Sequence, residues 1–374
     1  MSVAAERARA SLVEPDRLDG FSSPREVDRV FGHGEAIAEF AAALVSGRMH
    51  HAWLLVGPEG VGKATLAYAF ARRMLAQSGE SDIPVDHPVF RKVAGLAHPN
   101  LLLIRRSWIE KTKRYSQWIG VDEVRRLRAF LGHSAGESGW RVVIVDRADE
   151  LNQNAANALL KALEEPPPQT LFLLISSAEG RLPVTIRSRT RTLRVSGLGE
   201  EDLERAARAA LERDGQKADA KALKLALALS QGSVRRALEL VTSDGIALYE
   251  DIVATFSGLP DLDGARLHKQ VERLSGAGDT ERLELYLSLM IGLIERLIRH
   301  GATGEGAAGE TERELAKQLV SKDNLARWAE AWETISAEKA EAFALNLDRS
   351  LLVLDAWFRL QRLAREHPVY GTPR

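Results

Sequence analysis

The chain has 374 residues, of which 45% are apolar and 28% are charged, and its formal net charge is −1. This length predicts two or three domains, and the near-zero charge excludes a global positive field that would draw the chain to nucleic acid or an anionic membrane. Because the sequence holds no cysteine, it excludes disulfides, thiolate zinc sites, iron–sulfur clusters and cysteine nucleophiles.

No segment predicts export or membrane insertion. The N-terminal segment 1–16 carries charges throughout and lacks an apolar run, so it does not resemble a secretory signal. The most apolar later stretch, 283–297, contains Glu284, Glu295 and Arg296 and is too short to span a bilayer. We therefore expect a soluble protein with no membrane partner, in keeping with a reducing cytoplasm.

Strand and helix patterns alternate along the first half of the chain. In chain order we expect a polar, weakly helical arm at 1–28, a helix at 35–44, a strand at 52–56, a helix at 63–77, one strand at 101–104 within an otherwise irregular segment 78–120, a helix at 121–131, a strand at 141–146, a helix at 158–165 and a strand at 171–176. Such alternation predicts a parallel sheet with helices on both faces.

After Val195 the pattern changes to helices, with almost no β-rich runs. We expect the α/β core to span 29–195, followed by a small helical domain at 196–245 and a larger one at 246–374. A glycine-rich stretch at 300–310 predicts a loop between two helices of the larger domain.

A phosphate-binding loop is predicted at Gly57-Pro58-Glu59-Gly60-Val61-Gly62-Lys63-Ala64. The segment follows a predicted strand and opens a predicted helix, which is the context that a P-loop requires. In such a loop Gly57, Gly60 and Gly62 let backbone N–H groups surround phosphate oxygens, and Lys63 adds a positive charge. The alternative is a glycine turn that binds nothing.

The eighth position of the loop departs from the motif. A P-loop has Ser or Thr there because the hydroxyl coordinates Mg²⁺, but this chain has Ala64. Thr65 follows, and one residue along a helix is a rotation of about 100°, so its hydroxyl should not reach the same point. We expect phosphate binding to survive this change and metal placement to be lost.

Asp146 ends the predicted strand 141–146, which is where the Walker B acid of a P-loop nucleotide site is placed. The residue after it is Arg147, and two acids, Asp149 and Glu150, follow shortly. Because they lie beyond the end of the strand, we expect these two to belong to a turn or a helix start.

A family resemblance rests on the string from Asn152 to Pro167, NQNAANALLKALEEPP, together with HAWLLVGPEGVGKATLA, GVDEVRRL and LPVTIRSRT in the same order. These motifs closely resemble bacterial clamp-loader subunits of the AAA+ class over residues 28–240. The resemblance implies an AAA+ P-loop core at 29–195, a helical lid domain at 196–245 and a C-terminal helical collar domain at 246–374.

Within that family the chain is most similar to the delta-prime type, which often has a degraded ATP site. The gamma/tau type would have Ser or Thr at Ala64 and an acid at Arg147, where active AAA+ ATPases usually have the glutamate that polarises water. The resemblance thus implies a subunit of the DNA polymerase III holoenzyme with no polymerase site, no required cofactor, and no hydrolysis of any ATP or ADP it binds. The rival is a working ATPase in which Thr65 or Glu150 compensates.

No zinc is expected. Most bacterial relatives carry a four-cysteine zinc module just ahead of a His-Pro-Asp segment. Here residues 91–97 lead into His98-Pro99-Asn100 without a cysteine, and the histidines show no compensating ligand pattern.

An arginine that acts on a neighbouring subunit is implied by Ile186-Arg187-Ser188-Arg189-Thr190, which resembles the family's Ser-Arg-Cys motif. The resemblance implies that Arg189 points out of its own subunit and reaches the ATP bound next door, where a guanidinium stabilises charge on the γ-phosphate. The alternative is that Arg187 and Arg189 are solvated charges before an edge strand.

Two further features have both a functional and a structural interpretation. Ser176 and Ser177 lie where the family places a sensor residue, although capping hydrogen bonds explain them equally well. Arg235, in Gly232-Ser233-Val234-Arg235, resembles the lid arginine that contacts nucleotide, or is a structural charge.

A basic cluster with interleaved aromatic residues lies in the segment 78–120. Its members are Arg105, Arg106, Lys111, Lys113 and Arg114, with Trp108, Tyr115 and Trp118. Such a cluster can contact DNA phosphates and bases, or form a solvated loop packed by its aromatic side chains.

The function implied is that of a rigid stator in a pentameric clamp loader that opens a sliding clamp and places it on primed DNA. The implied partners are the gamma/tau and delta subunits and, through the complex, the clamp and the primed DNA. A second rival is a nucleic-acid-binding module that uses ATP only structurally.

Overall fold

The computed structural model describes residues 14–15, 17–77, 82–132, 139–274, 280–345, 349–367 and 369. The chain divides into two compact units. The first comprises residues 1–217 and 230–238, and the second comprises residues 218–229 and 239–374.

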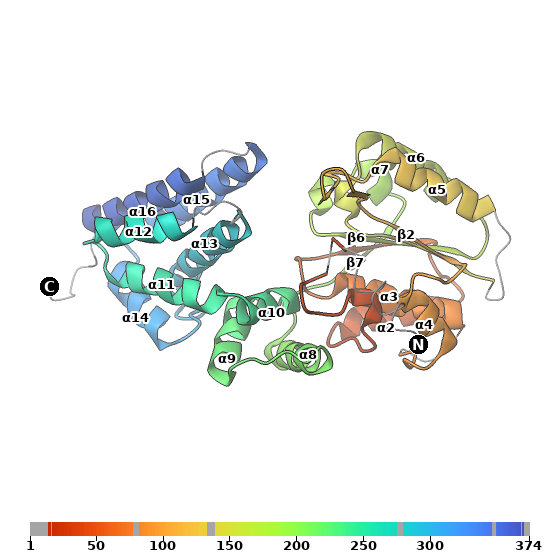
Figure 1. Ribbon diagram of the computed structural model, residues 1–374, viewed down its shortest axis with the longest axis horizontal. Helices are drawn as coiled ribbons and strands as arrows, with labels where there is room; N and C mark the ends of the chain where they lie inside the picture. Colours follow the sequence, from red (N-terminus) through yellow and green to blue (C-terminus); the bar gives the residue numbers. More distant parts are fainter. Residues whose placement is uncertain are drawn as a thin grey trace. The chain divides into compact units, whose positions relative to one another are not determined.

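A five-stranded parallel sheet forms the centre of the first unit, with the strand order β2-β5-β6-β1-β7 (Figure 1). The strands are β1 (Ala52–Val56), β2 (Leu101–Ile104), β5 (Arg141–Val145), β6 (Thr170–Ser176) and β7 (Arg191–Arg194). Every residue of β1 and β6 is buried, as expected for strands that are covered on both faces. The predicted parallel sheet is confirmed.

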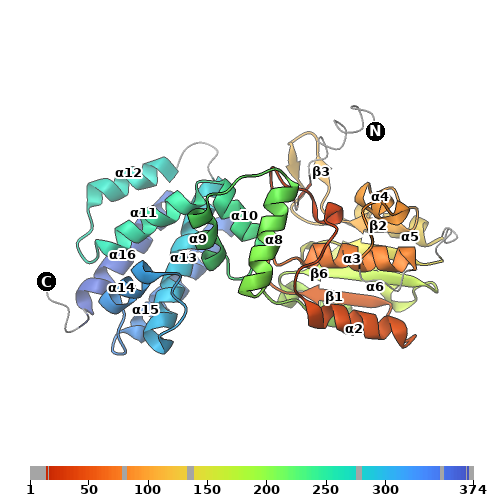
Figure 2. The same cartoon turned by 90° about the horizontal axis from the view of Figure 1, so that it is seen from below.

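Helices cover both faces of this sheet. One face carries α2 (Gly34–Val45), α3 (Lys63–Ala76) and α4 (Pro88–Ala94), and the other carries α5 (Val121–Gly132), α6 (Gln153–Glu164) and α7 (Val184–Arg187). Figure 2 shows α2 and α3 lying on their face of the sheet. Side chains alternate along β1, so Trp53 and Leu55 pack in the α2–α3 layer, whereas Leu54 and Val56 pack in the α5–α6 layer.

The segment 78–120 has more structure than the sequence predicted. Besides β2 it contains α4, which begins at Pro88 after the capping residue His87, and a two-stranded hairpin of β3 (Trp108–Ile109) and β4 (Arg114–Tyr115). Helix α4 is only seven residues long, and its buried side chains Phe90 and Val93 are too few to give a clear period. The prediction of one strand in an irregular segment is therefore wrong at these two places.

The described part of the N-terminal segment packs against the core. Arg25 is buried, donating from Nε to the carbonyl of Ala94 (2.7 Å) and pairing with Glu14 (2.5 Å). Arg72 of α3 donates to the carbonyls of Arg25 (3.2 Å) and Val27 (2.9 Å). Residues 17–28 thus contain a short 3₁₀ turn, η1 (Pro24–Glu26), fixed to α3 and α4, and the rest of the predicted arm lies largely outside the described residues.

Beyond Val195 the described chain is helical, as predicted. Of the segment 196–245, α8 (Glu200–Arg213) lies in the first unit and α9 (Ala220–Leu229) in the second. Helix α10 (Val234–Thr242) begins in the first unit and ends in the second, because the division falls after Leu238.

The second unit is built from helices around one apolar core. Besides α9 it contains α11 (Gly245–Ser257), α12 (Gly264–Leu274), α13 (Thr280–Thr303), α14 (Glu310–Leu319), α15 (Leu325–Leu345) and α16 (Arg349–Glu366). The loop predicted at 300–310 is shorter, because α13 extends to Thr303. In the core Trp357 stacks edge-on against Phe256 and donates from its ring nitrogen to the Tyr286 hydroxyl (3.0 Å).

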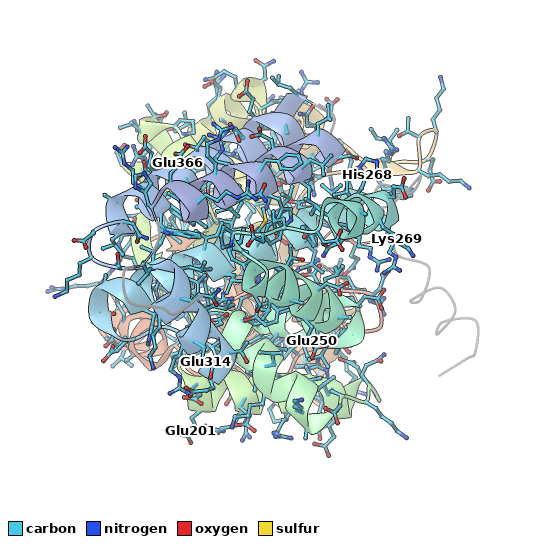
Figure 3. The ribbon with its side chains drawn as sticks, turned by 90° about the vertical axis from the view of Figure 1, so that its left-hand side faces the viewer. Glu201, Glu250, His268, Lys269, Glu314 and Glu366 are labelled. Carbon is cyan, nitrogen blue, oxygen red and sulfur yellow. The ribbon has the colours of Figure 1, made fainter. Side chains whose placement is uncertain are left out.

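Charged side chains cover the outside of this helical unit. Figure 3 shows Glu250, His268, Lys269, Glu314 and Glu366 on its outer surface, and all five are exposed. No helix among the described residues is both long enough and apolar enough to cross a bilayer.

One buried ion pair fixes α14 to α13 and α11. The carboxylate of Glu312 accepts from Arg296 Nε (3.0 Å) and Nη2 (2.8 Å), from the backbone N–H of Ala308 (2.6 Å) and from the Tyr249 hydroxyl. Only 6% of the Arg296 side chain and 2% of the Glu312 side chain are exposed. Removing one partner of such a pair leaves the other as an uncompensated buried charge.

We therefore expect Glu312→Ala to lower the free energy of unfolding by about 3–5 kcal/mol. Urea denaturation followed by tryptophan fluorescence measures the loss. The matched control is Glu310→Ala on the same helix, because Glu310 pairs with Arg313 at the surface. Equal losses in the two variants would contradict a stabilising role for the buried pair.

Candidate nucleotide site

The predicted phosphate loop lies between the end of β1 at Val56 and the start of α3 at Lys63. Gly60 has φ +76° and Gly62 has φ +105°, a backbone conformation that side-chain-bearing residues rarely adopt. A Cβ at Gly60 would also lie 2.3 Å from Ser233 Oγ and 2.7 Å from Arg235 Cβ. The loop therefore needs glycine, both for its turn and for the close approach of α10.

A cavity of about 620 Å³ opens beside this loop, within the size range of small-molecule sites. The part of its wall that we call the phosphate end is formed by Gly60, Gly62, Lys63, Ala64 and Thr65 from the loop and α3. Apolar side chains supply much of the remaining wall: Leu18, Phe21, Val27, Val30, Phe31, Ile175, Leu198, Ala206, Ala209, Ala210 and Leu238. An apolar chamber that ends at a phosphate loop fits a nucleotide.

The Lys63 side chain folds back onto its own loop. Its Nζ donates to the carbonyls of Gly57 (2.8 Å) and Pro58 (2.5 Å) and to Ser177 Oγ (2.9 Å), just beyond the end of β6. Burial lowers the pKa of Lys63 to about 8, against the opposing influence of nearby carboxylates. Asp149 accepts a hydrogen bond from the backbone N–H of Ser177 (3.2 Å). Ser177 is thus drawn into the site, as one of its two sequence interpretations expected.

Asp146 and Arg147 line the cavity at the end of β5. Asp146 is buried, and Arg147 adopts a left-handed backbone conformation with φ +59°. The guanidinium of Arg147 pairs with Glu59 of the phosphate loop (2.8 Å) and with Glu150 (3.2 Å). Asp146 therefore follows the strand, and the next residue in the cavity wall is an arginine and not a second acid.

The two acids that could compensate for Arg147 are near the site but are not part of the cavity wall. Asp149 and Glu150 belong to a 3₁₀ turn, η2 (Ala148–Glu150), and neither lines the cavity. Glu150 forms ion pairs with Arg106 (2.9 Å) and with Arg147. The expectation that both acids lie in a turn is confirmed, and Glu150 is engaged by two cations.

The phosphate end of the cavity does not fit a coordinated Mg²⁺ ion. Ala64 offers a methyl group where a P-loop supplies the coordinating hydroxyl, and Arg147, a fixed cation, lines the same cavity as Asp146. Among the residues that the structure describes, no group of three or more histidine or acidic side chains is placed to hold a metal ion. The residues fit a nucleotide better than they fit its metal.

Arg235 is brought to the site by α10. Its backbone N–H donates to the carbonyl of Gly60 (3.2 Å), and the residue lines the cavity. Arg189, which follows α7, does not line the cavity. Its side chain is 37% exposed, pairs with Glu164 at the end of α6 (2.9 Å) and donates to the carbonyl of Thr185 (3.0 Å).

Part of the predicted basic cluster is engaged within the chain. Arg105 pairs with Glu14 (3.4 Å) and Arg106 with Glu150, while Trp108 packs edge-on against Tyr115 across the β3–β4 hairpin. The side chains that remain exposed there are Lys111, Lys113, Arg114 and Trp118. His98 is buried, and its Nδ1 accepts from the backbone N–H of Asn100 (3.2 Å), which is a local turn contact.

The sequence did not point to the N-terminal wall of the cavity. Phe21 and Val27 line it from the segment 1–28, which was predicted to be a polar arm, and Phe31 lines it from the start of the predicted core. His33, which precedes α2, hydrogen-bonds through Nε2 to the carbonyl of Val61 (2.8 Å) and has its pKa lowered by burial. The only available signal was the scatter of apolar residues among the charges of 17–31.

Comparison with known proteins identifies the family of the core. Residues 32–198 match the family described as "DNA polymerase III, delta subunit". A DNA polymerase III gamma subunit of Buchnera aphidicola is 30% identical over 220 residues, and a delta-prime subunit of Pseudomonas aeruginosa is 39% identical over 140 residues. Residues 32–198, the core of the chain, are therefore similar to clamp-loader subunits of DNA polymerase III. The chain's parallel sheet with helices on both faces, followed by helices alone, is the fold class that the sequence predicted.

The similarity to clamp-loader subunits is partial. The match covers 58% of this chain and 58% of the Buchnera gamma subunit, but 37% of this chain and 41% of the Pseudomonas delta-prime subunit. The chain thus spans about half the length of the curated relatives it matches. Among solved structures, a gamma subunit-related protein of Thermotoga maritima covers 87% of this chain and 99% of its own at 18% identity, with a TM-score of 0.38.

The lowered pKa of Lys63 predicts a pH-dependent stability. Below about pH 8 the ammonium is charged in both the folded and the unfolded chain, so its burial costs stability in full. Between about 8 and the usual value of 10.5 the folded chain binds fewer protons than the unfolded chain, so stability rises with pH.

We expect this rise to be absent from Lys63→Met. In nucleotide-free protein, the free energy of unfolding of the native chain should rise by about 2 kcal/mol more than that of the variant between pH 7 and pH 10. Urea denaturation at the two pH values measures the gain. Lys161→Met, at an exposed position of α6, is the control and should track the native chain. A constant difference between Lys63→Met and native protein would show that the ammonium is not destabilised by burial.

Proposed function

We propose that the chain is a delta-prime-type subunit of a DNA polymerase III clamp loader and does not hydrolyse ATP itself. The observation that carries this proposal is the phosphate end of the cavity, where Ala64 replaces the metal-coordinating hydroxyl and Arg147 replaces the water-polarising acid. Each replacement removes a separate requirement of phosphoryl transfer.

The same cavity supports retained binding of a nucleotide. Its apolar wall suits a base, and the loop with Lys63 suits the phosphates, so ATP or ADP would be held by this chain without turnover. Within the loader the chain would act as a stator, with gamma/tau and delta subunits as partners. The sliding clamp and primed DNA would be met through the complex.

We propose that Arg189 serves the nucleotide of a neighbouring subunit. Its position outside the cavity of its own chain and its partial exposure suit this role. In the single chain Glu164 neutralises Arg189, and this exposed pair contributes little stability. A γ-phosphate of the neighbour would therefore compete readily with Glu164 for the guanidinium.

The alternative is an active ATPase of the gamma/tau type. It is favoured by the length of the match to the Buchnera gamma subunit, which exceeds the match to the Pseudomonas delta-prime subunit. It is disfavoured by Glu150, whose ion pairs with Arg106 and Arg147 occupy the acid that would have to compensate.

Assembly and turnover separate the two functions. Mixed with its candidate gamma/tau and delta subunits, the chain should form a stoichiometric complex by size-exclusion chromatography, and alone it should hydrolyse no ATP. Turnover by the isolated chain that Lys63→Ala abolishes would overturn the stator function in favour of the ATPase. Failure to form a complex would overturn both.

Arg189→Ala should leave the complex intact and lower its ATPase rate. The loss should equal the contribution of the single site that this chain faces, because an arginine finger contributes about 10³–10⁵ to the rate at its site. Steady-state ATPase of the assembled loader measures it. Arg194→Ala is the matched control, since Arg194 lies on β7 and pairs with Glu179 at the surface. An unchanged rate in the Arg189 variant would refute the finger assignment.

A further inference from the structure

We propose that the cavity binds the polyphosphate of a nucleotide without Mg²⁺, with the guanidinium of Arg147 supplying the charge that the metal supplies in an active site. The inference rests on the proposed function in one respect, that a nucleotide enters the cavity. It adds that nucleotide binding is independent of divalent cations.

The position of Arg147 is the first observation. It follows Asp146 directly at the end of β5 and lines the same cavity as Gly62 and Lys63. Its Nη2 lies 2.8 Å from Glu59 Oε1, and Glu59 is itself a residue of the phosphate loop. The guanidinium therefore already reaches the loop that would surround the phosphates.

The second observation is that Glu59 and Glu150, two acids that pair with Arg147, differ in exposure. The Glu59 side chain is 62% exposed, whereas that of Glu150 is 16% exposed and is also paired with Arg106. A solvent-exposed ion pair is weak, so phosphate oxygens can displace Glu59. Glu150 keeps its contact with Nη1 and continues to direct the guanidinium toward the loop, which makes it a positioning residue.

The charged side chains around the phosphate end are the third observation. Lys63, Arg147 and Arg235 are the cations that line the cavity near the loop, Glu59 and Asp146 are the acids there, and Asp149 is near enough to act on the pKa of Lys63. A planar guanidinium binds phosphate through two parallel N–H groups, which a single ammonium does not. A divalent cation placed near Asp146 would instead lie close to the fixed positive charge of Arg147 and would lack the hydroxyl ligand at Ala64. The arginine thus both replaces the metal and opposes its entry.

The test uses the full, nucleotide-free chain with ADP and ATP as probes, titrated by calorimetry in EDTA and in excess Mg²⁺. Native protein should bind each nucleotide with the same dissociation constant under both conditions, within about twofold. Arg147→Gln should bind about tenfold more weakly in EDTA. The surface variant Arg194→Gln should match native protein, and circular dichroism should confirm that each variant is folded.

A gain of nucleotide affinity in Glu59→Gln that depends on Arg147 would exclude a merely structural role for Arg147. Glu59→Gln removes the acid that competes with phosphate, so it should tighten binding in EDTA, and it should not do so when combined with Arg147→Gln. Strict Mg²⁺ dependence in native protein, or native affinity of Arg147→Gln in EDTA, would overturn the proposal. Absence of all nucleotide binding would also overturn it, while complex formation with the partner subunits would still decide the proposed function on its own.

Discussion

The parallel pairing of β1, β5 and β6 is the constraint on which the site depends. Because the carboxyl ends of parallel strands meet at one edge of a sheet, the segments that follow these strands converge there. The phosphate loop follows β1, Asp146 and Arg147 follow β5, and Ser177 follows β6. The bonds from Lys63 to its own loop and to Ser177 then join the first and third of these segments. A substitution at one strand end is therefore expected to shift the side chains at the others.

The site combines an intact binding frame with altered chemistry. The frame is the buried sheet, the glycine turn and the lysine, and it depends on backbone geometry that tolerates no substitution at Gly60. The chemistry depends on two side chains, and both have changed, at Ala64 and at Arg147. A cavity of this kind can therefore keep the frame that suits a nucleotide while lacking the two side chains that phosphoryl transfer requires.

The sequence predicted what depends on short-range pattern, namely the strands, most helices of the core and the phosphate loop. It failed where the decisive contacts are distant along the chain. The pair between Glu59 and Arg147 joins residues 88 positions apart, so the local sequence pattern could not predict this contact. Residues 1–28 look polar because their apolar side chains are few and scattered among charges, and only the folded cavity shows that Leu18, Phe21 and Val27 line it. The α4 helix and the β3–β4 hairpin were missed because both are too short for a period to emerge.

The N-terminal wall of the cavity also bears on where this domain begins. Similarity to the family starts at residue 32, yet Leu18, Phe21 and Val27 line the chamber, and Arg72 donates to the backbone carbonyls of Arg25 and Val27 in the same segment. The evolutionary boundary and the physical boundary of the domain therefore differ. A fragment cut at the start of the recognisable homology would retain the whole phosphate loop but expose the apolar side of its own binding chamber to water.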